Sequence, residues 1–148
     1  MIFGIPGNNI FAAIKMVESQ TAAALQSNIE YSPENHFPLE NIPFGAFLNL
    51  EEGKSVHVCT RIGDSVIDLA VLEQYGLFDG PLFSTLTKKN IFNQSTINEF
   101  IALGKDFWHE ARVTIQKLFT KGNDRLSNIS FKDSFTFSAS ECRMVLPI

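Results

Sequence analysis

Residues 56–72 read VHVCTRIGDSVIDLAVL, and the rest of the chain is interpreted around this stretch. The pair Gly63-Asp64 is typical of the two-residue turns that close β-hairpins, so a strand is predicted on each side of it. Because side chains alternate between the two faces of a strand, the turn sets Ile67 opposite Thr60. The predicted apolar face consists of Val56, Val58, Thr60, Ile62, Ile67 and Leu69, and the other face of His57, Cys59, Arg61, Val66 and Asp68. This second face is either a mixed surface or a face that another element covers.

Strand and helix boundaries flank the hairpin. The proline in each of the pairs Phe37-Pro38 and Ile42-Pro43 is expected to hold the residue before it extended, and the apolar run at 44–50 that follows predicts a further strand. The sequence Glu-Glu-Gly-Lys at 51–54 predicts the turn that ends this strand. Asp68 is placed to cap a short helix that runs through Tyr75, with Gly76 just past its end.

The most regular periodicity covers residues 97–119. Apolar side chains recur there at helical spacing, which predicts one long helix. Thr96 and Glu99 have the spacing of a capping box at its start. Gly104 lies on the apolar stripe, which predicts a close approach to a strand, and Trp108 on the same stripe is predicted to lie in the core.

The remaining segments are less regular. A turn is predicted at Asp79-Gly80-Pro81, followed by a short helix or an irregular apolar segment at 82–92. A polar loop at 123–128 precedes an apolar tail. Burial of six large side chains would contribute about 10 kcal/mol, so the tail is expected to pack against something. These side chains are Phe131, Phe135, Phe137, Met144, Val145 and Leu146.

Composition limits the classes of function. The 148 residues carry a formal net charge of −4, which offers no basic face for nucleic acid or for an anionic membrane, so neither is expected as a partner. Fourteen phenylalanines predict that ring packing dominates the core. Cys59 and Cys142 match no metal or redox spacing, and the N-terminus lacks the features of a secretory or mitochondrial signal. The expected location is the cytoplasm.

Two candidate catalytic patterns are weak. His57 and Cys59 lie two apart on one strand face, which makes a Cys-His nucleophile a hypothesis, but no oxyanion donor or third group is indicated. His109-Glu110 begins a zinc-protease pattern, but Val113 stands where the second His is required. The pair is therefore expected to lie on a helix surface.

Other charged residues have structural explanations. Asp64 and Asp68 could form paired carboxylates or a weak cation site, although turn formation and helix capping account for both. Arg61 is expected to form a surface ion pair with Asp68, worth at most about 1 kcal/mol. His36 lies in a loop beside Glu34 with no partner in view. The residues alone predict no catalytic, cofactor-binding or metal-binding side chain.

Four blocks of sequence follow one another in a fixed order. They are FPLENIPFGAF at 37–47; Arg61-Ile62-Gly63-Asp64 with Ile67-Asp68-Leu69; FNQ at 92–94 with TINEF at 96–100, Leu103-Gly104, Trp108 and Glu110-Ala111-Arg112; and Met144 with Leu146-Pro147. In order and spacing they resemble the N-terminal part of the fumarylacetoacetase family. Ser95 stands where that family usually has Pro, and Val145 where it often has His.

The resemblance implies an α+β fold and a domain plan. Residues 32–137 would form a small SH3-like β-barrel packed by the long helix, and 138–148 a linker or first strand toward a catalytic domain. In the family, the first metal-binding carboxylate follows the Leu-Pro that corresponds to Leu146-Pro147, so no family catalytic or metal position falls on this chain. Residues 1–31 would be a leader, partly disordered or weakly helical, with 1–15 an addition ahead of Met16.

The resemblance also implies a function. The complete enzyme would hydrolyse 4-fumarylacetoacetate to fumarate and acetoacetate, the last step of tyrosine and phenylalanine catabolism, as a homodimer with Ca²⁺ and Mg²⁺ as its cofactors. The favoured hypothesis is that this chain is its non-catalytic N-terminal domain, inactive alone, with the catalytic C-terminal domain as its partner. The alternatives are a stand-alone SH3-like protein-interaction module and a small hydrolase built on His57 and Cys59.

Overall fold

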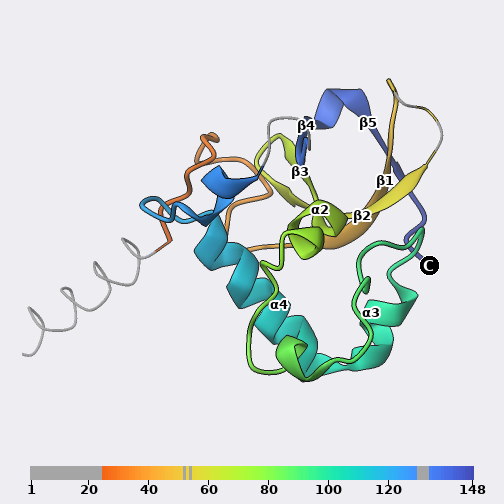
Figure 1. The fold of residues 1–148 in the computed structure, drawn as a ribbon. Coiled ribbons are helices and arrows are strands. Elements are labelled where there is room, and N and C mark those ends of the chain that lie inside the picture. The colour runs from red at the N-terminus through yellow and green to blue at the C-terminus, as the bar shows by residue number, and fades with distance from the viewer. Residues whose placement is uncertain (1–24, 52, 54, 130–133) are drawn as a thin grey trace, which may run out of the picture.

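The computed structural model describes residues 25–51, 53, 55–129 and 134–148. Five antiparallel strands form one sheet in the order β4-β3-β2-β1-β5, and the sheet curls into a half-barrel (Figure 1). The predicted leader at 1–31 lies mostly outside the described residues. The strands are β1 Phe44–Asn49, β2 Val56–Ile62, β3 Ser65–Asp68, β4 Thr136–Ser138 and β5 Cys142–Val145.

The β2-β3 hairpin has the predicted register. Thr60 pairs with Ile67, and the ladder ends at the pair of Cys59 and Asp68. Leu69 was expected to continue the strand face, but it begins helix α2 (Leu69–Gln74) instead. The backbone N–H of Ala70 donates to the Asp68 carboxylate at 2.9 Å, which confirms the predicted helix cap.

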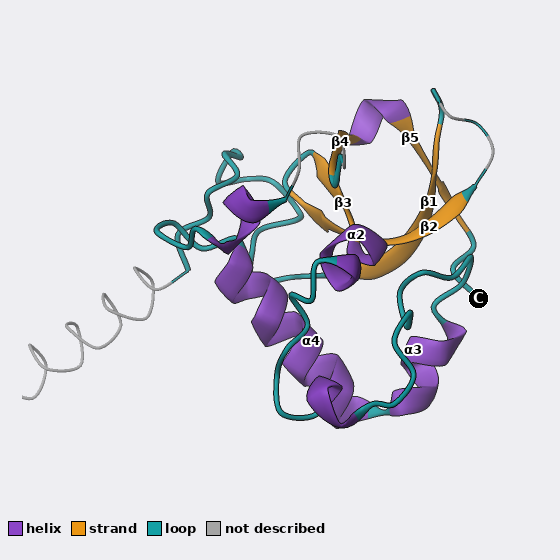
Figure 2. Cartoon of the chain, viewed as in Figure 1, coloured by secondary structure: helices purple, strands orange, loops and turns teal. Residues whose placement is uncertain are grey.

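The apolar face of the hairpin forms the main core. Its Val58, Ile62 and Ile67 side chains are fully buried. The helices lie below the sheet in Figure 2, and α2 is the helix nearest to it. Phenylalanine rings form a connected group within this core, because contacting rings follow one another at centroid distances of 4.6–6.1 Å, but most of the buried side chains around them are Leu, Ile and Val, so the predicted dominance of ring packing is wrong. These rings belong to Phe44, Phe100, Phe92, Phe78, Phe83 and Phe107.

The other face of the hairpin is covered over part of its area. Cys59 and Val66 are each only 1% exposed and pack with Phe47 of β1. Phe137 of β4 and Cys142 of β5 close this second, smaller cluster. Each of the two alternatives for this face is correct in part: the short strands β4 and β5 curl the sheet around Cys59 and Val66, whereas the side chains of His57 and Arg61 remain 30% and 29% exposed.

The single long helix predicted at 97–119 is wrong. Gly104 has φ 91° and ψ 177°, a conformation that side chains other than glycine rarely adopt, and it divides the segment into two helices. They are α3, Asn98–Leu103, and α4, Lys105–Leu118. A Cβ atom at Gly104 would meet nothing within 4 Å, so the expected close approach to a strand is also wrong.

Two further predictions for these helices fail. Ile97 is the N-cap of α3 and no side chain caps the helix there, so the Thr96–Glu99 capping box does not form; Glu99 pairs with Lys88 instead. Trp108 is 36% exposed rather than in the core. Its indole N–H donates to the carbonyl of Phe100 at 2.9 Å, so the ring spans the corner between α3 and α4.

The C-terminal tail is packed along one side only. β5 pairs with β1 over Ala46 to Asn49, and the Ile97 N–H donates to the Pro147 carbonyl at 2.8 Å. Met144 and Leu146 are nevertheless 52% and 83% exposed. Three 3₁₀ turns complete the described structure: η1 Phe83–Thr85, η2 Arg125–Asn128 and η3 Ala139–Glu141. Phe131 lies outside the described residues.

Candidate functional site

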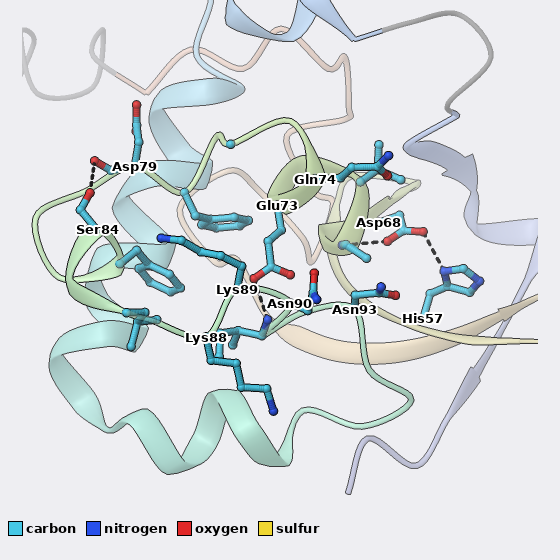
Figure 3. A pocket seen from close by; sticks show the side chains of 17 residues that line it. His57, Asp68, Glu73, Gln74, Asp79, Ser84, Lys88, Lys89, Asn90 and Asn93 are labelled. Carbon is cyan, nitrogen blue, oxygen red and sulfur yellow. Dashed lines mark hydrogen bonds and ion pairs between the residues drawn. The ribbon is translucent and has the colours of Figure 1, made fainter.

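A cavity of about 820 Å³ opens between α2 and the segment 76–93 (Figure 3). Its walls combine phenylalanine and aliphatic side chains with charged and amide groups. Figure 3 shows His57 and Asp68 at one end of the cavity, Asp79 and Ser84 at the other, and Glu73 between them. The charged and polar lining residues are His57, Asp68, Glu73, Gln74, Asp79, Ser84, Lys88, Lys89, Asn90 and Asn93.

Asp68 is the last residue of β3 and lines the cavity. Its carboxylate is 2.9 Å from Nδ1 of His57, and the Asp68 residue is only 3% exposed. Burial raises the pKa of Asp68, while His57 and the backbone N–H groups of Ala70 and Val71 partly offset that rise. Asp68 is therefore a buried, fully partnered carboxylate.

The predicted ion pair of Arg61 with Asp68 is wrong. Arg61 instead contacts Asp64 across the turn, at 3.3 Å, and donates from Nε to the carbonyl of Gly63 at 3.0 Å. Its guanidinium lies 4.1 Å from the ring centroid of Phe37. The reason is that the buried Asp68 carboxylate already pairs with His57 and caps the start of α2, whereas the Arg61 side chain lies at the turn.

The structure gives no support to a nucleophile at Cys59. Burial, with the nearby Asp68 and Cys142, raises the pKa of the Cys59 thiol to about 12. A thiol with that pKa is protonated at neutral pH, and the Nδ1 atom of His57 is engaged by Asp68. His57 and Cys59 share a strand face, as predicted, without forming an activated pair.

Two glutamates that sequence reasoning missed hold the cavity wall. The carboxylate of Glu73 accepts hydrogen bonds from the N–H groups of Ile91 and Phe92, at 2.7 and 3.0 Å. The carboxylate of Glu110 accepts from the N–H groups of Leu82 and Phe83, at 3.0 and 2.9 Å. Each glutamate satisfies two neighbouring backbone donors in a segment without a regular hydrogen-bond ladder.

Glu110 was expected to lie on a helix surface with His109, and that expectation is wrong for Glu110. It is half-buried, and a Cβ atom at Gly80 would collide with its carboxylate. His109 is exposed, as expected. Two features of the sequence could have indicated that Glu110 is partly buried. It directly precedes Ala111 on the apolar stripe, and the turn at 79–81 contains a glycine that leaves room for its carboxylate.

The other candidate residues are spread over the surface. His36 is exposed, and Glu34 accepts a hydrogen bond from the Ser32 hydroxyl at 2.6 Å. Asp64 is engaged by Arg61, so it does not form a carboxylate pair with Asp68. Within the described ranges, no three His, Cys, Asp or Glu side chains lie close enough together to hold a metal ion.

Over the part of the chain that the structure describes, none of the helices combines the length and the apolar content needed to cross a bilayer.

The fold and the cavity together define a small α+β domain built on a curled antiparallel sheet. Residues 40–147 match the family described as fumarylacetoacetase N-terminal. The chain belongs to that family. The match covers every strand and helix from β1 to β5.

Curated relatives agree with this assignment. The chain is 39% identical to a fumarylacetoacetase of Dictyostelium discoideum over 124 residues, which is 83% of this chain and 28% of the relative. It is 37% identical to the fumarylacetoacetase of Oryza sativa over 127 residues, 84% of this chain and 29% of the relative. The human fumarylacetoacetase is 35% identical over 100 residues, 68% of this chain and 23% of the relative. The chain thus spans less than a third of the length of these relatives.

Proposed function

We propose that this chain is the non-catalytic N-terminal domain of a fumarylacetoacetase. The complete enzyme would hydrolyse 4-fumarylacetoacetate to fumarate and acetoacetate at the end of tyrosine and phenylalanine breakdown. The observation that carries the proposal is the family match over residues 40–147, at 39% identity to a relative of that name. The curled sheet with its covered concave face supports an SH3-like barrel as the finer description of the fold.

The partner in this proposal is the catalytic domain of the same enzyme. β5 is an edge strand, and Met144, Leu146 and Ile148 present apolar side chains that are 52%, 83% and 72% exposed. Exposed apolar side chains along a strand edge are typical of a surface that another element covers. Divalent cations, Ca²⁺ or Mg²⁺, would be held by the catalytic domain, and the complete enzyme would be a cytoplasmic homodimer.

The test is an assay of fumarylacetoacetate cleavage. We expect no turnover by the purified 148-residue chain alone, and increased activity or thermal stability when it is mixed with a separately expressed fumarylacetoacetase catalytic domain. Met144→Lys should abolish that effect, because it places a charge among the exposed apolar side chains, whereas Lys117→Glu on the exposed side of α4 should not. Turnover by the chain alone would refute the proposal.

The same exposed side chains also suit a second function, a stand-alone SH3-like interaction module without enzymatic activity. The two proposals differ in what they predict for the mixture. A module of this kind would remain a folded monomer and leave both the activity and the stability of the catalytic domain unchanged. Analytical ultracentrifugation of the mixture distinguishes them, since only the first proposal predicts a complex.

A further inference from the structure

The carboxylates that line the cavity are all engaged by the protein itself. Asp68 pairs with His57 at 2.9 Å, and Glu73 accepts two backbone N–H groups. Asp79 forms an ion pair with Arg125 at 2.8 Å. Their negative charge is therefore directed at groups of the chain rather than at the space of the cavity, which argues against a cation as its ligand.

The two lysines of the cavity differ in their partners. Lys88 lies 2.6 Å from the Glu99 carboxylate, so its charge is matched. Lys89 has no hydrogen bond or ion pair with any residue in the described part of the chain. Figure 3 shows its side chain extended along the cavity, away from His57 and toward the end where Asp79 and Ser84 lie. Lys89 is an exposed residue on the wall of this cavity, so its positive charge faces solvent and is available to a ligand.

The surface beside Lys89 is apolar and held in place. Phe78, Phe83 and Ile91 line the cavity and are themselves at most 9% exposed, so they form a packed floor. Glu73 binds the N–H group of Ile91, which follows Lys89 by two residues. A backbone fixed in this way keeps the position of Lys89 along the cavity wall constant before a ligand arrives, which lowers the entropic cost of binding.

We propose that this cavity binds a small organic monocarboxylate. The carboxylate pairs with the Lys89 ammonium, and the apolar body of the ligand lies over Phe78 and Phe83. A single lysine ammonium matches the one negative charge of a carboxylate better than the charge of a phosphate, which exceeds one at neutral pH. The net charge of −4 on the chain also repels a multiply charged anion more strongly. A cavity of about 820 Å³ has ample room for a ligand of the size of one aromatic ring.

The test is a titration of the ¹⁵N-labelled full chain followed by two-dimensional NMR. Benzoate is the probe, benzamide is its neutral counterpart, and inorganic phosphate is the alternative anion. We expect benzoate to shift amide signals of residues 76–93, and Lys89→Gln to weaken that binding about tenfold, the usual cost of losing one charge-assisted contact. Lys88→Gln is the matched control, because Lys88 lines the same cavity but is already paired with Glu99. It should change the affinity by less than about twofold.

Each other outcome would overturn the proposal. Benzamide binding as tightly as benzoate would show that the carboxylate is not recognised. Phosphate producing the same shifts at the same concentration would show that the apolar floor contributes nothing. Equal losses in the Lys88 and Lys89 variants would show an unspecific charge effect, and the absence of any benzoate shift would remove the site. Because none of these outcomes involves fumarylacetoacetate cleavage, the result is independent of the proposed function.

Discussion

Replacing Glu73 by Gln tests whether one carboxylate holds the cavity wall. The carboxylate accepts from two adjacent N–H groups, those of Ile91 and Phe92, and both residues are nearly fully buried. A Gln side chain has one oxygen to accept with and an NH₂ group that would face the other N–H. One hydrogen bond then loses its charged acceptor and the second is lost with a buried donor unpaired. Together these changes cost about 3 kcal/mol of unfolding free energy.

Urea unfolding, followed by the fluorescence of the single tryptophan, measures this loss. Glu99→Gln is the matched control, because Glu99 pairs with Lys88 in an exposed position and its loss should cost at most about 1 kcal/mol. Hydrogen exchange at the amides of Ile91 and Phe92 should accelerate in the Glu73 variant only. The reasoning is refuted if both variants lose the same stability, or if those two amides keep their protection.

Three further predictions concern the sheet and the helices. Burial raises the pKa of the Cys59 thiol from 9.0 to about 12. The stability that the protonated thiol contributes is therefore complete below pH 9 and is lost as pH rises toward 12, by about 4 kcal/mol in all. Cys59→Ala should remove this alkaline loss in denaturation curves measured across that range. Gly104→Ala should cost about 1–3 kcal/mol in urea unfolding, because alanine is strained at φ 91°. Asp68→Ala should cost about 2–3 kcal/mol by the same measurement and Asp68→Asn about 1 kcal/mol less, because Asn keeps the cap of α2.

Each of these has a clear contrary result. An alkaline slope that is unchanged in Cys59→Ala would assign the loss to other groups. A stabilised Gly104→Ala variant with increased helical circular dichroism would mean that α3 and α4 can join into one helix. Equal losses for Asp68→Ala and Asp68→Asn would mean that capping contributes nothing at Asp68 and that only its charge matters.

The sequence predicted the features that depend on neighbouring residues. The turn at Gly63-Asp64 determined the pairing of Thr60 with Ile67, because a two-residue turn allows only one register. Asp68 could be recognised as a helix cap because its partner is two residues away. The four blocks of the resemblance predicted the family, which the match over 40–147 confirms.

Features that depend on distant residues or on small energy differences were missed. A glycine inside a helix costs only about 1 kcal/mol, so the periodicity at 97–119 did not distinguish one helix from two joined at Gly104. Glu73 and Glu110 resemble solvent-facing helix residues until the segment at 82–92 is placed against them. The cover over Cys59 comes from β4 and β5, whose pairing partners lie far away along the chain.

The position of β5 has a consequence for the order of folding. Ala46 near the start of the described fold pairs with Val145 near its end, and closing a loop of that length costs about 4 kcal/mol of chain entropy. On the ribosome, β2 and β3 can form their hairpin early, but the outer edge of β1 must wait for the last strand to be synthesised. Until β5 has been synthesised, β1 is an unprotected template for other chains, so the nascent protein is most vulnerable to aggregation in the interval before β5 pairs with β1.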